Sequence, residues 1–410
     1  MKRTLIAFAM ATLVVGTGFA QLRPNNQDGV NVFETQKQDS YSSDFKVEFG
    51  GGFTQSWQAL KNVINTAPTL PVVDIQPGFN LAEANLATNV YLAEGVTLNM
   101  ELYLSARHHN ETWVKGGFIQ FDRLPFLKSQ IVDDIMKYTT IKVGHMEINY
   151  GDAHFRRSDG GNSIFNPFIE NNIMDAFDTE IGGEILYQRS GFLGMIGASN
   201  GSIKGDVTTP NSPVSVYGKL GYDKQINDDF RVRLTGSIYN APGGVRGTLF
   251  GGDRTGSHYY YALHDLAQYK ADAKAGFTTG RYNPGFSGKF TSVAGNLFLQ
   301  YKGLESFTTV ENVGDTVNNA MQFATELVYR FGGSKQFFVG AKYNTVSGTD
   351  SKSKEASISR ITGSAGWFVT KNVLAKAEYV NQTYGNVAAF ASPLKNNGFK
   401  GVVFEAVVGF

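Results

Sequence analysis

The chain has 410 residues, no cysteine and a formal net charge of +1, from 37 basic and 36 acidic side chains. This balance lacks the strongly basic character of a nucleic-acid-binding protein, so no nucleic-acid partner is expected. Without cysteine, no disulfide bond can stabilise the fold, so a packed core or the closure of a sheet must do so.

Residues 1–20 have the pattern of a secretory signal peptide. Two basic residues follow the first methionine, and an apolar run then occupies residues 5–15. The run is shorter than the about 20 apolar residues that a membrane-spanning helix requires, and this order of regions is typical of an export signal. We expect cleavage after Ala20. Residues 21–43 are polar and aperiodic, which predicts a mostly unstructured periplasmic lead-in.

From residue 44 onward, apolar and polar side chains alternate in many short segments. The clearest case runs from Val96 to Arg107, where aliphatic residues occupy every second position. A period of two predicts β-strands whose two faces meet different surroundings. Strands are predicted near residues 44–54, 79–93, 96–107, 112–122, 139–149, 180–188, 192–200, 214–223, 230–238, 289–301, 304–310, 319–331, 336–347, 356–370, 373–384 and 398–410. One short helix is expected within residues 127–136.

The last predicted strand, Gly398–Phe410, has apolar side chains at its even positions and ends on an aromatic residue. An apolar outward face with aromatic residues at its ends suits a strand that crosses lipid. The segment resembles the C-terminal strand of bacterial outer-membrane barrels, which is recognised for insertion. The resemblance implies that the barrel-assembly machinery would bind the strand that ends at Phe410.

Backbone groups in hydrocarbon must be paired within the protein, so strands cross a membrane only as a closed sheet. We therefore predict an all-β fold for residues 44–410, a transmembrane antiparallel β-barrel of about 16 strands embedded in outer-membrane lipid. Short and long connections alternate, which indicates short periplasmic turns and long extracellular loops. A soluble β-sandwich or solenoid is the alternative, because alternation alone does not say which face points outward.

A barrel of this size leaves an aqueous channel inside. The side chains predicted to face the lumen include many charges, which we expect to line a water-filled pore because they cannot be buried dry. They are Glu101, Arg107, Glu184, Lys219, Arg231, Arg233, Glu326, Arg330, Lys342, Arg360, Lys376 and Glu378. The arginines would suit an anion pore, but the similar number of acidic residues is equally consistent with a weakly selective pore.

Residues 150–178 form a long segment without periodicity, and such loops are usually functional. If it folds inward, Arg156, Arg157, Asp159 and Glu170 would form the constriction of the pore. The alternative is an external loop that caps the barrel or meets a neighbouring subunit. A second irregular region, residues 240–288, is longer still.

Residues 141–151 read Ile-Lys-Val-Gly-His-Met-Glu-Ile-Asn-Tyr-Gly, and the strand after the loop opens with Thr-Glu-Ile-Gly at 179–182. This resembles the phosphate-selective porin O/P group and the related porins of Bacteroidota, in which a strand with a Val-Gly step runs into a long loop. The resemblance implies a trimeric channel for small anions. That group has a basic residue and a proline soon after the glycine, where this chain has Glu147 and Asn149.

We find no Gly-x-Ser-x-Gly elbow, no His or Cys set with metal-ligand spacing and no phosphate-binding glycine loop. Neither enzymatic activity nor a cofactor or metal is expected. The sequence predicts an outer-membrane porin, a homotrimer through which small hydrophilic solutes or anions diffuse passively with at most a weak preference for anions. The alternative is a non-conducting barrel, an accessory or docking subunit of an outer-membrane complex whose lumen is plugged by residues 240–288.

Overall fold

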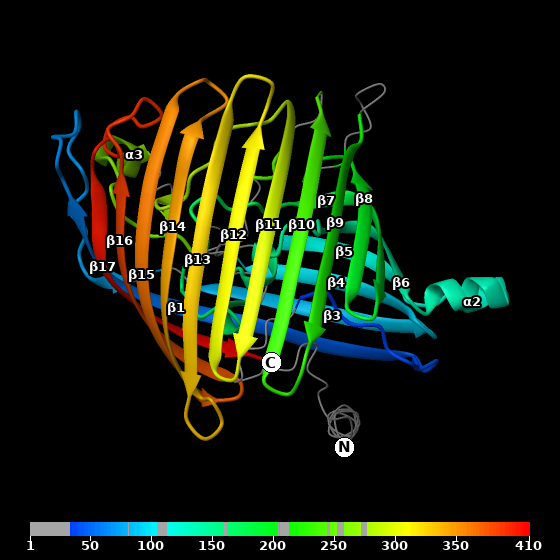
Figure 1. Cartoon of the computed structure of the whole chain (residues 1–410). Coiled ribbons are helices and arrows are strands. Elements are labelled where there is room, and N and C mark those ends of the chain that lie inside the picture. The colour runs from blue at the N-terminus through cyan, green and yellow to red at the C-terminus, as the bar shows by residue number, and fades with distance from the viewer. Residues whose placement is uncertain are drawn as a thin grey trace, which may run out of the picture.

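The computed structural model describes residues 33–80, 82–104, 113–158, 162–203, 205, 213–243, 247–251, 258–271 and 277–410. A single antiparallel sheet closes on itself into a barrel, because the first strand pairs with both the last strand and the third (Figure 1). The strands are β1 (Lys46–Val63), β2 (Gly78–Phe79), β3 (Glu83–Ala93), β4 (Val96–Leu104), β5 (Trp113–Phe121), β6 (Thr139–Glu147), β7 (Thr179–Arg189), β8 (Phe192–Ser199), β9 (Ser215–Gln225), β10 (Phe230–Pro242), β11 (Lys289–Tyr301), β12 (Leu304–Gly314), β13 (Asn319–Phe331), β14 (Phe337–Thr349), β15 (Glu355–Thr370), β16 (Val373–Tyr384) and β17 (Gly398–Gly409).

The barrel has 16 strand positions, as predicted. The two-residue strand β2 pairs with Trp57 and Gln58 of β1, beyond the point where β3 stops pairing, so it takes no separate place in the ring. Each of the sixteen predicted segments overlaps one of the longer strands. Several bounds were wrong: β1 continues to Val63, where a connection was expected, and β10 and β12 continue to Pro242 and Gly314 rather than ending near Ile238 and Val310.

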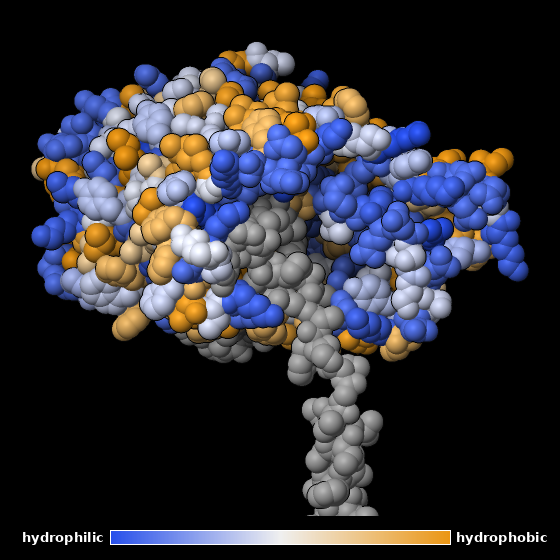
Figure 2. All heavy atoms as spheres, turned by 60° about the horizontal axis from the view of Figure 1, so that its bottom comes forward, coloured by the Kyte–Doolittle hydropathy of each residue, from blue (hydrophilic) through white to orange (hydrophobic). Residues whose placement is uncertain are grey.

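The predicted alternation of faces is confirmed along the strands. In β10, Leu234 and Ile238 are exposed on the outside, while Arg233, Thr235 and Ser237 are buried inside. Apolar side chains are spread over the outer flanks of the barrel, with hydrophilic ones between them (Figure 2). This is the inverse of a soluble β-sandwich, whose apolar faces form the core.

The short connections between strands lie together. Short turns at Glu94-Gly95, Ser190-Gly191, Lys302-Gly303 and Lys371-Asn372 lie at one end of the barrel, which we call the turn end. The helix expected within residues 127–136 is present as a 3₁₀ turn (Pro125–Leu127) followed by α2 (Gln130–Met136), also between two strands at this end and protruding from the wall (Figure 1). No helix in the described part of the chain is both long and apolar enough to cross a membrane.

The interior of the barrel is filled by segments from three parts of the chain. The first is the inner loop, residues 150–158 and 162–178. The second inner segment comprises residues 247–251, 258–264 and 277–286, and the third is Phe33-Glu34. Side chains of the inner loop such as Ile173 have no exposed surface. The expected water-filled lumen around the charged wall residues is therefore wrong for most of them, because protein groups from these segments take the place of water.

Candidate functional site

The inner loop crosses the lumen to the opposite wall. Its backbone N–H groups at Ile169, Ile173 and Met174 donate hydrogen bonds to side chains of β16, β14 and β13, at 2.7 Å, 2.7 Å and 2.8 Å. The accepting residues are Glu378, Asn344 and Gln322. These bonds satisfy buried donors of a loop that has no strand of its own. The loop thus lies inside the barrel and not outside it.

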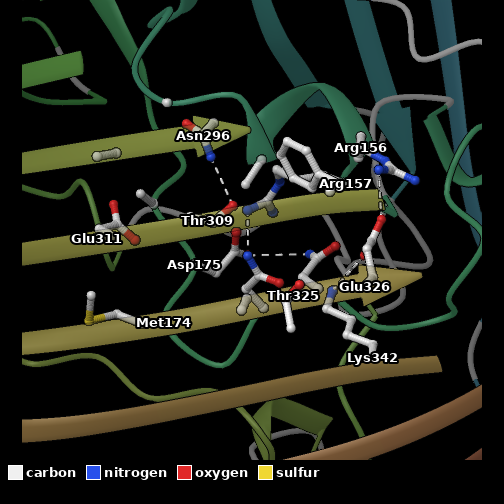
Figure 3. Close-up of a pocket in the computed structure, with 18 of the residues that line it drawn as sticks. Arg156, Arg157, Met174, Asp175, Asn296, Thr309, Glu311, Thr325, Glu326 and Lys342 are labelled. Atoms are coloured by element: carbon white, nitrogen blue, oxygen red, sulfur yellow. Dashed lines mark hydrogen bonds and ion pairs between the residues drawn. The ribbon is translucent and has the colours of Figure 1, made fainter. Parts of the chain in front are cut away.

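A small cavity of about 40 Å³ remains between the inner loop and the wall formed by β11 to β14 (Figure 3). Its lining is strongly charged but nearly balanced in sign. The charged residues are Arg156, Arg157, Glu170, Asp175, Glu311, Glu326 and Lys342. A lining with nearly balanced charge favours neither sign of ion strongly.

The cavity charges are held in pairs. Arg156 Nη1 lies 2.6 Å from Glu326 Oε1, and Lys342 Nζ lies 3.7 Å from the other oxygen of that carboxylate. Arg157 pairs with Asp175, and its guanidinium lies 3.9 Å from the ring centroid of Phe177. These fixed pairs orient the arginines toward the edge of the cavity.

Glu170 lies on the inner loop and also lines the cavity. Burial raises the pKa of its carboxyl well above the ordinary value, and the nearby carboxylate of Glu378 raises it further, against the opposing effect of Arg360. The charged form of Glu170 is therefore less favourable than that of an exposed glutamate.

Other predicted site residues face inward but bind protein groups. Glu184 Oε1 forms an ion pair with Lys142 Nζ at 3.0 Å, and Arg330 donates a hydrogen bond to Glu305 at 2.7 Å. Glu101 lies 3.4 Å from Lys115. The remaining contacts are Arg360 with the carbonyl groups of Asn171 and Gly280, Lys376 with Glu405 at 2.6 Å, and Glu378 with the Tyr260 hydroxyl at 2.7 Å. Arg107 and Asp159 lie outside the described residues.

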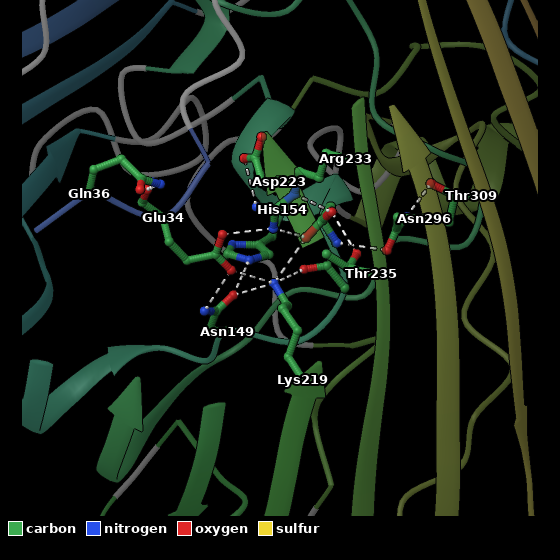
Figure 4. Close-up of polar contacts among 12 residues, drawn as sticks. Glu34, Gln36, Asn149, His154, Lys219, Asp223, Arg233, Thr235, Asn296 and Thr309 are labelled. Atoms are coloured by element: carbon green, nitrogen blue, oxygen red, sulfur yellow. Dashed lines mark hydrogen bonds and ion pairs between the residues drawn. The ribbon is translucent and has the colours of Figure 1, made fainter. Parts of the chain in front are cut away.

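A second charged cluster lies where the inner loop leaves β6 (Figure 4). Asp152 accepts two hydrogen bonds from Arg233 at 2.7 Å and 2.8 Å, and one from the Thr235 hydroxyl at 2.7 Å. Lys219 Nζ lies 3.0 Å from the same carboxylate. Burial opposes the charge of Asp152, but Lys219 and Arg233 outweigh it and hold the pKa far below its usual range. We call Lys219, Arg233 and Asn149 the basic site.

Glu34 completes this cluster from the lead-in. Its carboxylate lies 3.1 Å from Lys219 Nζ and 2.7 Å from Arg233 Nη2, and the Asn149 amide donates to it at 3.1 Å. Burial alone would raise the pKa of Glu34, yet Lys219 and then Arg233 lower it to about 2. Sequence analysis missed Glu34 because it lies in a polar stretch without periodicity. It also missed Asp152, which only its place at the start of the long loop could have indicated.

Comparison with solved structures agrees with this architecture, whereas two other comparisons found no match. No protein-family model and no curated protein matches the chain. Among solved structures, the anion-selective porin from Comamonas acidovorans is similar over 90% of this chain and 100% of its own, at 10% identity and a TM-score of 0.53. The outer membrane channel DcaP of Acinetobacter baumannii is similar over 89% of this chain and 97% of its own, at 10% identity and a TM-score of 0.52.

At this level of identity the likeness shows the fold. The chain is a 16-stranded antiparallel β-barrel of the type found in bacterial outer-membrane porins. This architecture indicates the bacterial outer membrane as its location, with the exposed apolar belt facing lipid.

Proposed function

We propose that the chain is an outer-membrane porin in which small hydrophilic solutes diffuse through a narrow passage beside the inner loop. The observation that carries this proposal is the inner loop itself, which is fixed to the opposite wall and leaves a small cavity lined by charged side chains. The balanced lining supports at most a weak preference for anions. The inward-facing charges predicted from the sequence would set the electrostatic potential that a solute meets in the passage. This role requires no catalysis, cofactor or metal.

The finer points of this proposal rest on the sequence. The segment at 141–151 and its resemblance to the phosphate-selective porin O/P group support a homotrimer and small anionic solutes. The exposed Phe404, Val408 and Phe410 of the last strand support recognition by the barrel-assembly machinery. We propose that residues 1–20 are removed on export, which N-terminal sequencing of the mature protein tests, and chemical cross-linking in outer membranes tests the trimer.

The filled interior favours a second candidate, a non-conducting barrel. Residues of the second inner segment such as Leu249, Tyr260 and Ala262 are almost fully enclosed. We expect purified, folded protein in a planar lipid bilayer to give steady single-channel steps, smaller than those of a barrel without inner segments. A correctly folded protein that stays electrically silent at all voltages would contradict the porin and support an accessory barrel.

Replacing both Arg156 and Arg157 with alanine should shift ion selectivity toward cations. The change removes two positive charges from the cavity and leaves Glu326 and Asp175 without them. The reversal potential in a salt gradient measures the shift. Lys224→Ala is the matched control, because Lys224 is exposed near the turn end of β9 and away from the cavity. An unchanged reversal potential in the double variant would place the ion path elsewhere.

A further inference from the structure

In the described part of the lead-in, residues 33–43, two side chains enter the barrel. Phe33 and Glu34 are buried, whereas residues 35–45 are mostly exposed and form neither helix nor strand. Apart from these two residues, the lead-in is fixed chiefly by Lys37, which donates to the Asp122 carboxylate at 3.1 Å and to the carbonyl groups of Asp122 and Thr139. The described part of the lead-in thus makes few contacts for a segment that reaches into the lumen.

Both buried side chains contact the same arginine. The Phe33 ring centroid lies 4.1 Å from the Arg233 guanidinium, and the Glu34 carboxylate lies 2.7 Å from its Nη2. Phe155 of the inner loop and Phe298 of β11 pack edge-on against Phe33, with ring centroids 5.8 Å and 5.6 Å away. A carboxylate and an aromatic ring are therefore recognised together, by a cation and an aromatic wall.

Glu34 also differs from the other acidic residue of the cluster. Asp152 belongs to the inner loop and binds Arg233 through two hydrogen bonds, so it is the built-in counter-ion. Glu34 comes from outside the sheet and approaches Lys219 across 185 positions of sequence. Among the described residues, the three cations Lys219, Arg231 and Arg233 form ion pairs with Asp152, Asp223 and Glu34. Without Glu34, two carboxylates would face three cations, which leaves an excess positive charge in a buried place.

We propose that the basic site is a ligand-binding site, that Phe33 and Glu34 are its tethered resident ligand, and that it also accepts free carboxylates carried beside an aromatic ring, such as short acidic peptides. The lead-in then competes with such solutes from within the chain. A tethered competitor acts at an effective concentration on the order of millimolar, so it masks the site without any other protein. The inference deepens the proposed porin function, but binding itself does not depend on conduction.

Calorimetric titration of the folded protein in detergent with the peptide N-acetyl-Phe-Glu-amide tests this proposal. We expect the double variant Phe33→Ala/Glu34→Ala to bind the peptide at least tenfold more tightly than the wild type, because its site is vacant. The uncharged peptide N-acetyl-Phe-Gln-amide should bind neither protein. Asp39→Asn is the matched control, because it removes an exposed carboxylate of the same segment and should leave the wild-type affinity unchanged.

Equal affinity of the wild type and the double variant for the acidic peptide would overturn the proposal, as would equal affinity of the double variant for both peptides. Retention of the folded form is checked by circular dichroism. Adding Lys219→Met to the double variant should abolish binding, and unchanged binding there would also count against the basic site. Peptide binding is measured independently of conduction. A barrel that binds the peptide but conducts no current would refute the porin proposal alone. A barrel that conducts current but does not bind the peptide would refute this inference alone.

Discussion

Replacing Leu220 with arginine is expected to lower the free energy of unfolding by about 2–4 kcal/mol in lipid, the cost of an arginine at the bilayer midplane of a barrel. Leu220 lies in the middle of β9, between Gly194 of β8 and Gly236 of β10, and its side chain is 72% exposed on the outer wall. Equilibrium unfolding in denaturant, with the protein folded into phospholipid bilayers, measures this change.

Two controls separate the membrane from simpler causes. Leu220→Ala removes the same side chain without adding charge and should cost less than the arginine. Asn227→Arg places an arginine at the turn end, where an added charge costs about 0–1 kcal/mol. On an ordinary water-exposed surface, Leu220→Arg would change stability by no more than about 0.5 kcal/mol. A change that small would mean that the outer wall does not face hydrocarbon.

Arg233→Met should destabilise the barrel by about 3–5 kcal/mol, because it leaves buried carboxylates without their main partner. Arg233 is 1% exposed and binds Asp152, Glu34 and Asp223. Methionine keeps much of the side-chain volume but none of the charge. The same unfolding measurement in lipid reports the loss.

Arg231→Met is the matched control for that variant. Arg231 is partly exposed, and its partner Asp223 keeps a second contact with Arg233 at 3.2 Å. Its loss should cost on the order of 1 kcal/mol or less. Similar losses for the two variants would show that the cluster around Asp152 contributes no more than a surface ion pair.

The strands could be predicted because each residue in the membrane zone meets either lipid or the interior. That rule fails beyond the membrane zone, which explains the missed ends of β1 and β12. In β1, Leu60 points inward and Lys61 outward, the reverse of the pattern near Phe53. In β12, Val313 is buried inside and Asn312 faces out. At the rim the outer face meets water and the inner face packs on inner segments, so the polarity is inverted.

The interior could not be predicted, because its contacts join residues far apart in the chain. The inner loop has no periodicity that tells its direction, and Ile173 reaches Asn344 across 171 positions. Charged residues such as Lys219 were assigned to the correct face, but the sequence does not show that Glu34 and Asp152 would be their partners. Alternation predicts which way a side chain points and not what fills the space it points into.

The meeting of β1 and β17 has a consequence for how the protein is made. These two strands join from Gly52 opposite Gly409 to Val63 opposite Gly398, and Gly51 exchanges backbone hydrogen bonds with Phe410. β1 is synthesised first and β17 last. Any partly formed sheet therefore has two unpaired edge strands, which could pair with strands of other chains. The ring can therefore close only when its last-made strand is present.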